Sequence, residues 1–290
     1  MLSFVPDAEQ RMWRTLSRSK YQLVRDRIRL QNQLEAMLEE ARIKLSSVIS
    51  DLLGLSGGRI LAALAKGTTD PVKLAELGDA LTGSPEPIHL EVLQLFLDRL
   101  ELLDKQIQSL DTLIARELKR HEVAVIRVAQ IPGFGVDSAQ QIIAEVGVDA
   151  ETFPSAAQFS SWAGTCPGSE ESAEQNQSSR SPKGNRFVRR ILTQAAQAAV
   201  KKKGCHFQTV FRRLSPKLGC KGAIWAIAHR LGRLLWKILH DGVAYVEQGT
   251  ETNPAARKRR AQKLANALRR LGYQVTLTPP NASPVISPAG

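Results

Sequence analysis

Acidic residues are absent from a long stretch of this sequence. Between Glu174 and Asp241 there is no Asp or Glu, whereas fifteen Lys and Arg residues fall in the same stretch. An ordinary solvated surface mixes charges of both signs, so this stretch is not typical of one. The whole chain has a formal net charge of +12. Both features favour a polyanionic partner, nucleic acid before membrane, and a surface that faces phosphates.

Cysteine and long apolar runs are also scarce. The three cysteines, Cys166, Cys205 and Cys220, are odd in number and form no Cys-x-x-Cys pair, which excludes a fully paired disulfide framework and indicates a reducing compartment. No run reaches the roughly 18 apolar residues of a membrane span. The first residues lack the basic and apolar regions of a signal peptide. We therefore expect a cytoplasmic protein without membrane contact.

Alternating strand patterns are nearly absent, and residues 272–278 are the only short candidate. Helical patterns dominate instead. Residues 7–53 are predicted to form one long helix with a heptad stripe that Lys20 and Arg27 interrupt. Residues 88–128 carry a second heptad seam, made of Leu93, Phe96, Leu100, Leu103, Ile107, Leu110 and Ile114. The sequence therefore predicts an all-α fold.

The two long helices have three possible arrangements. We predict a long antiparallel coiled-coil hairpin within one chain, although two helices of one globular bundle fit the pattern equally well and a parallel pairing between two chains also fits it. The predicted division of the chain is a coiled-coil linker or dimerisation region at residues 1–128, a compact helical domain at 129–250, and a basic helix with a disordered tail at 251–290.

Shorter helical patterns fill the rest of the chain. Asp7 is expected to cap the first helix, and Asp137 or Ser138 the helix that ends at Gly147. Further helices are predicted at residues 59–66, 71–77, 187–202, 221–246 and 255–271, with a basic segment at 204–217 and a short helix after Pro154. Loops are predicted at residues 82–87 and 164–185, a disordered tail at 279–290, and core positions for Trp225 and Trp236.

A glycine turn at residues 131–135 separates two apolar helical patterns. Gly133 and Gly135 permit positive φ and close backbone approach. Amides at the start of the next helix could then hold a phosphate without reading the base sequence. The element resembles a helix-hairpin-helix, although a plain corner between two helices would show the same spacing. We predict that both glycines contact nucleic acid.

The basic stretch supplies the other predicted contacts. We expect nucleic acid to bind Arg180, Lys183, Asn185, Arg186, Arg189, Arg190, Lys201 and Lys202. Ser172 lies just before this stretch, where a phosphodiester held by these side chains would be near its hydroxyl. A hydroxyl attacks phosphorus only when a base or a positive field stabilises its alkoxide. On composition alone the plainer interpretation, one more serine of a flexible loop, is favoured.

Several short motifs follow one another in a fixed order. They are Phe153-Pro154, Trp162-Ala163-Gly164, Cys166-Pro167-Gly168, Glu171-Ser172-Ala173, Lys183-Gly184-Asn185 and Arg189-Arg190. Together they resemble the C-terminal half of a bacterial insertion-sequence 110 family transposase, one of the bridge-RNA-guided recombinases. The resemblance extends over roughly residues 5–249.

The resemblance implies that Ser172 is the nucleophile of DNA strand exchange and forms a covalent serine–DNA intermediate. It implies DNA as substrate, a guide (bridge) RNA, a homodimer or homotetramer, and a place at the bacterial nucleoid. In the family a separate acidic domain, with a DEDD set of residues, binds Mg²⁺. No such set is found here, so we expect no metal site and no cofactor in this chain. We expect the isolated chain to be inactive or only partly active.

One departure from the family pattern leaves alternatives open. Glu174, Gln175 and Asn176 stand where family members commonly have Gly-Lys-Arg. A carboxylate two residues from the nucleophile repels a phosphate by about 1 kcal/mol at a surface-like effective dielectric. A non-catalytic DNA- or RNA-binding remnant and a coiled-coil dimerisation module are therefore the alternatives to a transposase with a working serine.

Overall fold

The computed structural model describes residues 5–45, 51–66, 86–166, 170–172, 175–178, 181–247, 249 and 254–277. The chain divides into two compact units that interleave along the sequence. Unit 1 comprises Met1–Gln130, Gly135–Phe159 and Leu235–Val243, and unit 2 comprises Ile131–Phe134, Ser160–Leu234 and Ala244–Gly290. The linear division at residues 128 and 250 stays a prediction.

The predicted all-α fold is confirmed. Among the described residues the helices are α1 (Ala8–Glu40), α2 (Leu55–Ala65), α4 (Pro87–Glu117), η3 (Lys119–His121), α5 (Glu122–Ala129), α6 (Val136–Val146), α7 (Ala156–Ala163), α8 (Arg186–Lys201), α9 (His206–His240) and α10 (Pro254–Arg270). The strands of that part of the chain are β1 (Glu170–Ser172) and β2 (Gln175–Ser178), one antiparallel pair. No helix in the described ranges is both long and apolar enough to cross a bilayer.

Helix α1 begins where the sequence predicts and ends earlier. The Asp7 carboxylate accepts a hydrogen bond of 2.6 Å from the amide of Gln10, which satisfies a donor that the first turn leaves unpaired. The helix was predicted to reach residue 53, but it ends at Glu40, and Arg42 adopts a φ of 59°. This left-handed residue redirects the chain, and Ile43 is buried just beyond it. Ile43 and Leu45 are therefore buried by a turn of the chain and not by further turns of helix α1.

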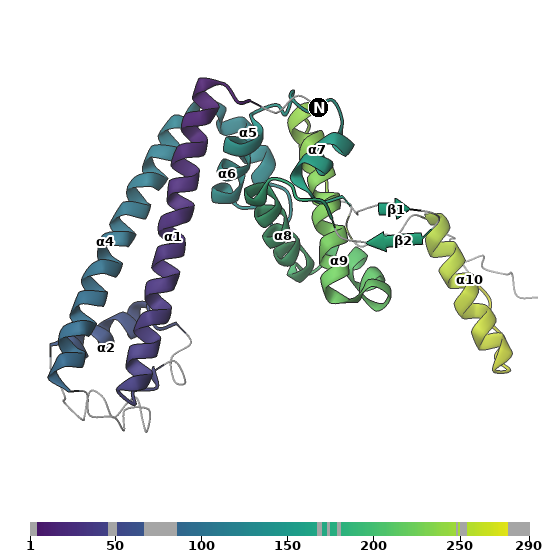
Figure 1. The fold of residues 1–290 in the computed structure, drawn as a ribbon. Coiled ribbons are helices and arrows are strands. Elements are labelled where there is room, and N and C mark those ends of the chain that lie inside the picture. Colours follow the sequence, from purple (N-terminus) through teal and green to yellow (C-terminus); the bar gives the residue numbers. More distant parts are fainter. Residues whose placement is uncertain are drawn as a thin grey trace, which may run out of the picture. The chain divides into compact units, whose positions relative to one another are not determined.

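Helices α1 and α4 lie side by side and antiparallel, with α2 packed at one end (Figure 1). A step of seven residues along α1, from Lys20 to Arg27, moves the ion-pair partner seven residues back along α4, from Asp111 to Asp104. This reversal is the signature of an antiparallel pair within one chain. Knobs-into-holes packing of a coiled coil stays a prediction. The shared core contains Leu30, Leu34, Leu38, Leu61, Leu64, Leu93, Leu100 and Leu103.

Lys20, which interrupts the apolar stripe of α1, is buried between carboxylates. Its ammonium pairs with Asp111 on α4 and with Asp137 on α6. Burial lowers the pKa of Lys20, but the hydrogen bonds to the two carboxylates outweigh this effect, and the net pKa is raised. Lys20 therefore stays charged. The break in the heptad stripe marks the point where a third helix joins the pair.

The second long helical pattern, residues 88–128, is not one helix. Helix α4 ends at Glu117, one 3₁₀ turn follows, and α5 begins at Glu122. Trp13 of α1 meets His121 edge-on at this turn, with ring centroids 5.2 Å apart. Helix α5 then packs against α6 and buries Ala124, Val125 and Val128. Apolar residues continue through the break, so the heptad pattern does not reveal the change of direction.

Helices α8 and α9 both contribute buried apolar residues to unit 2. Helix α8 buries Val188, Ile191, Leu192, Ala195, Ala196 and Ala199. Helix α9 is kinked at Gly219, which has a φ of 70° and a ψ of 169°, so it consists of two helical segments. This agrees with the predicted separation of residues 204–217 from 221–246, although α9 ends at His240 rather than at residue 246.

The loop predicted at residues 164–185 contains a β-hairpin. Glu171 pairs with Asn176 and Ser172 with Gln175. The two strands are polar and have only three and four residues, so they carry no apolar alternation for the sequence to display. The strand candidate at residues 272–278 has no regular structure over its described part.

Three further predictions concern the region between α1 and α4. Helix α2 begins at Leu55 rather than at residue 59. Gly57 lies inside this helix, and a Cβ there would be 2.2 Å from the carbonyl oxygen of Leu52, so this glycine permits close packing. The helix predicted at residues 71–77 and most of the loop at 82–87 lie outside the described residues, as does the tail at 279–290.

Candidate nucleic-acid interface

The glycine turn at residues 131–135 is a packing contact for helix α8. Gly133 has a φ of +91°, a conformation that side chains with a Cβ rarely adopt. A Cβ at this position would lie 2.0 Å from the carbonyl oxygen of Ala195 and 3.0 Å from the amide nitrogen of Ala199. Only glycine therefore lets the turn touch the helix backbone. The turn and α8 are held together within unit 2.

Gly135, not Asp137 or Ser138, is the residue that precedes α6. The Gly135 amide donates to the Ser138 hydroxyl oxygen at 2.8 Å, and that hydroxyl lies 2.9 Å from the Gly135 carbonyl. The predicted cap is thus wrong by two or three residues, since Asp137 pairs with Lys20 instead. A Cβ on Gly135 would meet no atom within 4 Å. The phosphate contact of a helix-hairpin-helix stays a prediction for both glycines.

Asn185 begins helix α8. Its side-chain oxygen accepts hydrogen bonds from the amides of Phe187 at 2.9 Å and Val188 at 3.2 Å, and its own amide donates to the carbonyl of Trp162 at 3.0 Å. The next residue, Arg186, is exposed, and its guanidinium lies 4.8 Å from the centre of the Phe187 ring. Asn185 thus has a structural role at the start of the basic helix, whereas Arg186 is accessible to a ligand.

The two ends of the segment that contains Ser172 meet where the backbones of Gly164 and Gly184 touch. A Cβ on Gly184 would lie 2.2 Å from the amide nitrogen of Gly164, and a Cβ on Gly164 would lie 2.6 Å from the amide nitrogen of Gly184. Two glycines permit this contact of backbone with backbone because neither carries a side chain. The crossing immediately precedes Asn185. Both ends of residues 165–183 are therefore held beside the start of α8.

Ser172 is the last residue of β1, and two residues separate it from its strand partner Gln175. Its backbone lies in the hairpin that the Gly164–Gly184 crossing holds. The position of the Ser172 hydroxyl and the predicted contact through Arg180 fall outside what the structure describes. The structure therefore brings the root of the serine segment to the basic helix, and the nucleophile itself stays a prediction.

The part of unit 2 from residue 181 to residue 234 presents many exposed cations. They are Lys183, Arg186, Lys201, Lys202, Lys203, Arg212, Arg213, Lys217, Lys221, Arg230 and Arg233. Within the described ranges none of them has a carboxylate oxygen within 4 Å. Like charges that are not neutralised by the protein repel one another and attract polyanions. We refer to these eleven residues as the exposed cations of unit 2.

Arg189 and Arg190 are only half-exposed, and the protein uses both of them. The Arg189 guanidinium lies 4.6 Å from the centre of the Trp225 ring and donates to the carbonyl of Pro182 at 3.3 Å. Arg190 donates a hydrogen bond within α8. The Trp225 indole N–H donates to the hydroxyl of Ser181 at 2.6 Å. Trp225 was predicted to be a core residue, but it is half-buried and its indole N–H contacts another segment. The spacing of residues on a helix does not show what the polar edge of a side chain contacts.

His229 lies one helical turn after Trp225 on α9. The backbone of Thr165, the residue after Gly164, lies beside its ring, and the ring Nδ1 is buried without a hydrogen-bond partner among the described residues. Burial lowers the pKa of His229, and the nearby cations Arg233 and Arg230 lower it further, whereas the backbone of Thr165 raises it. The net pKa is lowered, so His229 is neutral at pH 7. One face of α9 thus contacts both ends of the serine segment.

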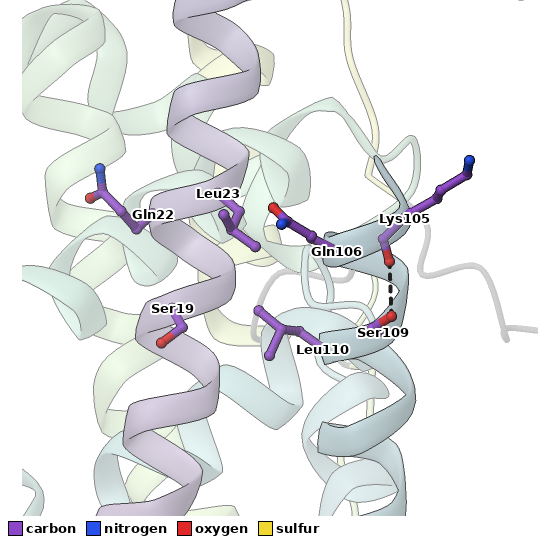
Figure 2. Close-up of a pocket in the computed structure, with 7 residues that line it drawn as sticks. All are labelled: Ser19, Gln22, Leu23, Lys105, Gln106, Ser109 and Leu110. Atoms are coloured by element: carbon purple, nitrogen blue, oxygen red, sulfur yellow. Dashed lines mark hydrogen bonds between the residues drawn. The ribbon is translucent and has the colours of Figure 1, made fainter. Parts of the chain in front are cut away.

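A groove runs between α1 and α4 in unit 1 (Figure 2). It is lined by Ser19, Gln22, Leu23, Lys105, Gln106, Ser109 and Leu110. Leu23 and Leu110 point toward the space between the helices, while Lys105 points away from it. None of these lining residues is a carboxylate, so the groove does not fit the acidic magnesium site that the resemblance implies for the family. Over the described ranges no three His, Cys, Asp or Glu side chains lie close enough together to hold a metal ion.

Comparisons with known proteins agree with the resemblance. Residues 126–212 match the model of the family described as Transposase IS116/IS110/IS902 family. A "Probable family 20 transposase" of Pseudomonas aeruginosa is 27% identical over 221 residues, which cover 74% of this chain and 63% of that protein. An "Insertion element IS900 uncharacterized 42 kDa protein" of Mycobacterium paratuberculosis is 27% identical over 146 residues, which cover 49% of this chain and 36% of that protein. The chain thus spans less than two thirds of the length of either relative.

Proposed function

We propose that this chain is the nucleic-acid-binding part of a DNA transposase, because residues 126–212 match the model of the IS116/IS110/IS902 transposase family. The observation that carries the proposal is the set of exposed cations of unit 2. No acidic residue occurs between residues 181 and 234 to neutralise them. The family match includes the glycine turn, the hairpin with Ser172, and the whole of α8.

The cations supply binding to the sugar–phosphate backbone. Lysine and arginine side chains neutralise phosphates and release condensed counterions, which gives affinity without sequence specificity. Lys201, Lys202 and Lys203 stand together at the end of α8, and Lys183 and Arg186 flank its start. We propose that DNA follows α8 between these two groups. We also propose that a guide RNA selects the site and that two or four copies of the chain assemble, on the strength of the resemblance alone.

The proposed chemistry is a transesterification at Ser172. The serine oxygen forms a bond to phosphorus, the bond from phosphorus to one ester oxygen of the strand breaks, and the serine proton passes to the released oxygen, directly or through a base. One ester replaces another, so no external energy source is required. The exposed cations of unit 2 would stabilise the negative charge that accumulates on the phosphoryl oxygens. No metal-dependent step is proposed for this chain.

Ser172→Ala is expected to abolish a covalent protein–DNA adduct while DNA affinity stays within about twofold, because the hydroxyl is needed for bond formation and not for phosphate binding. The substrate is a duplex with a phosphorothiolate linkage, whose released thiol is too poor a nucleophile to reverse the step. Adduct is measured by gel shift under denaturing conditions, with and without a full-length relative that supplies an acidic domain. Ser178→Ala, in the partner strand, is the matched control. Absence of adduct from the unsubstituted chain in both arms would favour a non-catalytic binding remnant.

Replacement of Lys201, Lys202 and Lys203 by alanine is expected to weaken DNA binding and reduce its salt dependence. Each phosphate contact contributes about −0.9 to the slope of log K against log salt, so the slope should become shallower by roughly 2 to 3. Fluorescence anisotropy between 50 and 300 mM salt measures this. Lys105→Ala, an exposed lysine on α4 that pairs with Glu101, is the control and should leave the slope unchanged. Salt-independent or absent DNA binding would instead support a dimerisation module.

A further inference from the structure

The two ends of the segment that contains Ser172 meet one face of helix α9. Trp225 and His229 are four residues apart and therefore lie on the same side of that helix. The Trp225 indole donates to Ser181 at the returning end, and the His229 ring lies beside the backbone of Thr165 at the leaving end. All of these contacts lie within unit 2.

Arg189 adds a third contact to this arrangement. Its guanidinium stacks on Trp225 at 4.6 Å and donates to the carbonyl of Pro182, the residue after Ser181. An arginine that only bound phosphate would not need to stack on an indole or to hold a carbonyl of the returning chain. A planar guanidinium can do both at once, whereas a lysine ammonium cannot. The guanidinium is half-exposed, so donors remain for a ligand.

We propose that Trp225 and Arg189 are positioning residues that fix the root of the Ser172 hairpin against the basic helix α8. They hold the returning end of the segment at Ser181 and Pro182, next to the Gly164–Gly184 crossing, so that Ser172 is presented from a rigid base and not from a free loop. The proposal rests on the proposed function, because a fixed hairpin root assists catalysis only if Ser172 is the nucleophile. The contacts themselves can be tested without any reaction.

Hydrogen exchange of the full chain tests the clamp directly. Trp225→Phe retains a ring beneath Arg189 but removes the N–H, and Ser181→Ala removes its acceptor. One neutral hydrogen bond has a net worth of about 0.5–1.5 kcal/mol, so amides in peptides that span residues 166–185 should exchange roughly 2- to 12-fold faster in either variant. The amide of Asn185, bonded to Trp162, is the most direct reporter.

Trp236→Phe is the matched control. Its indole also donates one short bond, 2.7 Å to the carbonyl of Phe153, but in unit 1. That variant should leave exchange in residues 166–185 unchanged. Unchanged exchange in both Trp225→Phe and Ser181→Ala, with native circular dichroism, would overturn the proposal whether or not the chain reacts with DNA.

A second readout separates positioning from binding. If Ser172 forms an adduct, Trp225→Phe and Ser181→Ala should slow adduct formation by about threefold or more while the Kd for DNA changes by less than twofold. Arg189→Lys keeps the charge and loses the stacking, and it should behave like Trp225→Phe. An equal loss of DNA affinity and adduct rate in Arg189→Lys would assign this arginine to phosphate binding instead. If the unsubstituted chain forms no adduct, the exchange experiment still decides the clamp.

Discussion

Gly133→Ala is expected to destabilise unit 2 by about 2 to 5 kcal/mol, one of the two largest single-residue effects that the structure predicts. The substitution introduces a Cβ at 2.0 Å from the carbonyl oxygen of Ala195 in a backbone with a φ of +91°. The strain of that conformation costs about 1–3 kcal/mol, and displacing the helix backbone costs a similar amount. The obstructing atoms belong to the main chain of α8 and cannot rotate aside. Urea denaturation followed by circular dichroism measures the loss.

Gly135→Ala is the natural control because it lies two residues away in the same turn. Gly135 has a φ of −118°, and an added Cβ would meet nothing within 4 Å. We expect a loss below about 1 kcal/mol, mainly from the weaker preference for alanine before a helix. If both variants lost stability equally, the contact between the turn and α8 would not be the reason for Gly133. If Gly135→Ala weakened DNA binding at full stability, the phosphate contact of a helix-hairpin-helix would gain support.

Glu145→Gln is expected to destabilise unit 1 by about 3 to 5 kcal/mol. Glu145 is 1% exposed and accepts two hydrogen bonds from Arg18, at 2.8 and 2.9 Å. Arg14 lies 3.6 Å from the same carboxylate and also donates to the carbonyls of residues 144 and 145. Removing the negative charge leaves the guanidinium of Arg14 buried without its counter-ion, which is the costly way to break a buried pair. Thermal or urea denaturation reports the change.

An exposed pair of the same kind provides the comparison. Glu101 pairs with Lys105 one turn along α4, with side chains 67% and 70% exposed. Glu101→Gln should cost no more than about 0.5 kcal/mol, because water screens the pair. A second variant with Arg14→Met, Arg18→Met and Glu145→Leu should recover much of the stability, since no buried charge remains. A loss below 1 kcal/mol in Glu145→Gln would show that this junction does not hold α1 to α6.

The ion pairs of Arg18 with Glu145 and of Lys20 with Asp111 and Asp137 could not be predicted from the sequence. The position of Lys20 in an apolar stripe was visible, but its partners Asp111 and Asp137 lie 91 and 117 residues away in the chain. Hydrophobic periodicity reports which face of a helix is buried and not what that face meets. The sequence accordingly left the direction of the pairing open, and the ion pairs show that α1 and α4 are antiparallel within one chain. Whether the pair packs as a coiled coil or as part of a bundle stays a prediction.

The contacts of the glycines and of Trp225 could not be predicted from local sequence patterns either. Gly133 and Gly135 look alike in the sequence, yet one packs on a helix backbone and the other faces open space. Trp225 and Trp236 were both predicted to be core, and each directs its indole N–H to a different segment. Steric exclusion and hydrogen bonding act between atoms that are distant in the chain, so no local pattern contains them.

The sequence by itself determined the all-α class, the cap at Asp7, the break near Gly219 and the charge of the basic stretch, because helix periodicity, capping and net charge are local properties. Its motifs also determined the family resemblance. Only the tertiary structure decided that residues 165–183 close on the Gly164–Gly184 crossing, that Trp225 holds the returning end and that His229 lies beside the leaving end. Those contacts join residues up to 64 positions apart, and the free energy that selects them comes from burial and hydrogen bonding in the folded chain.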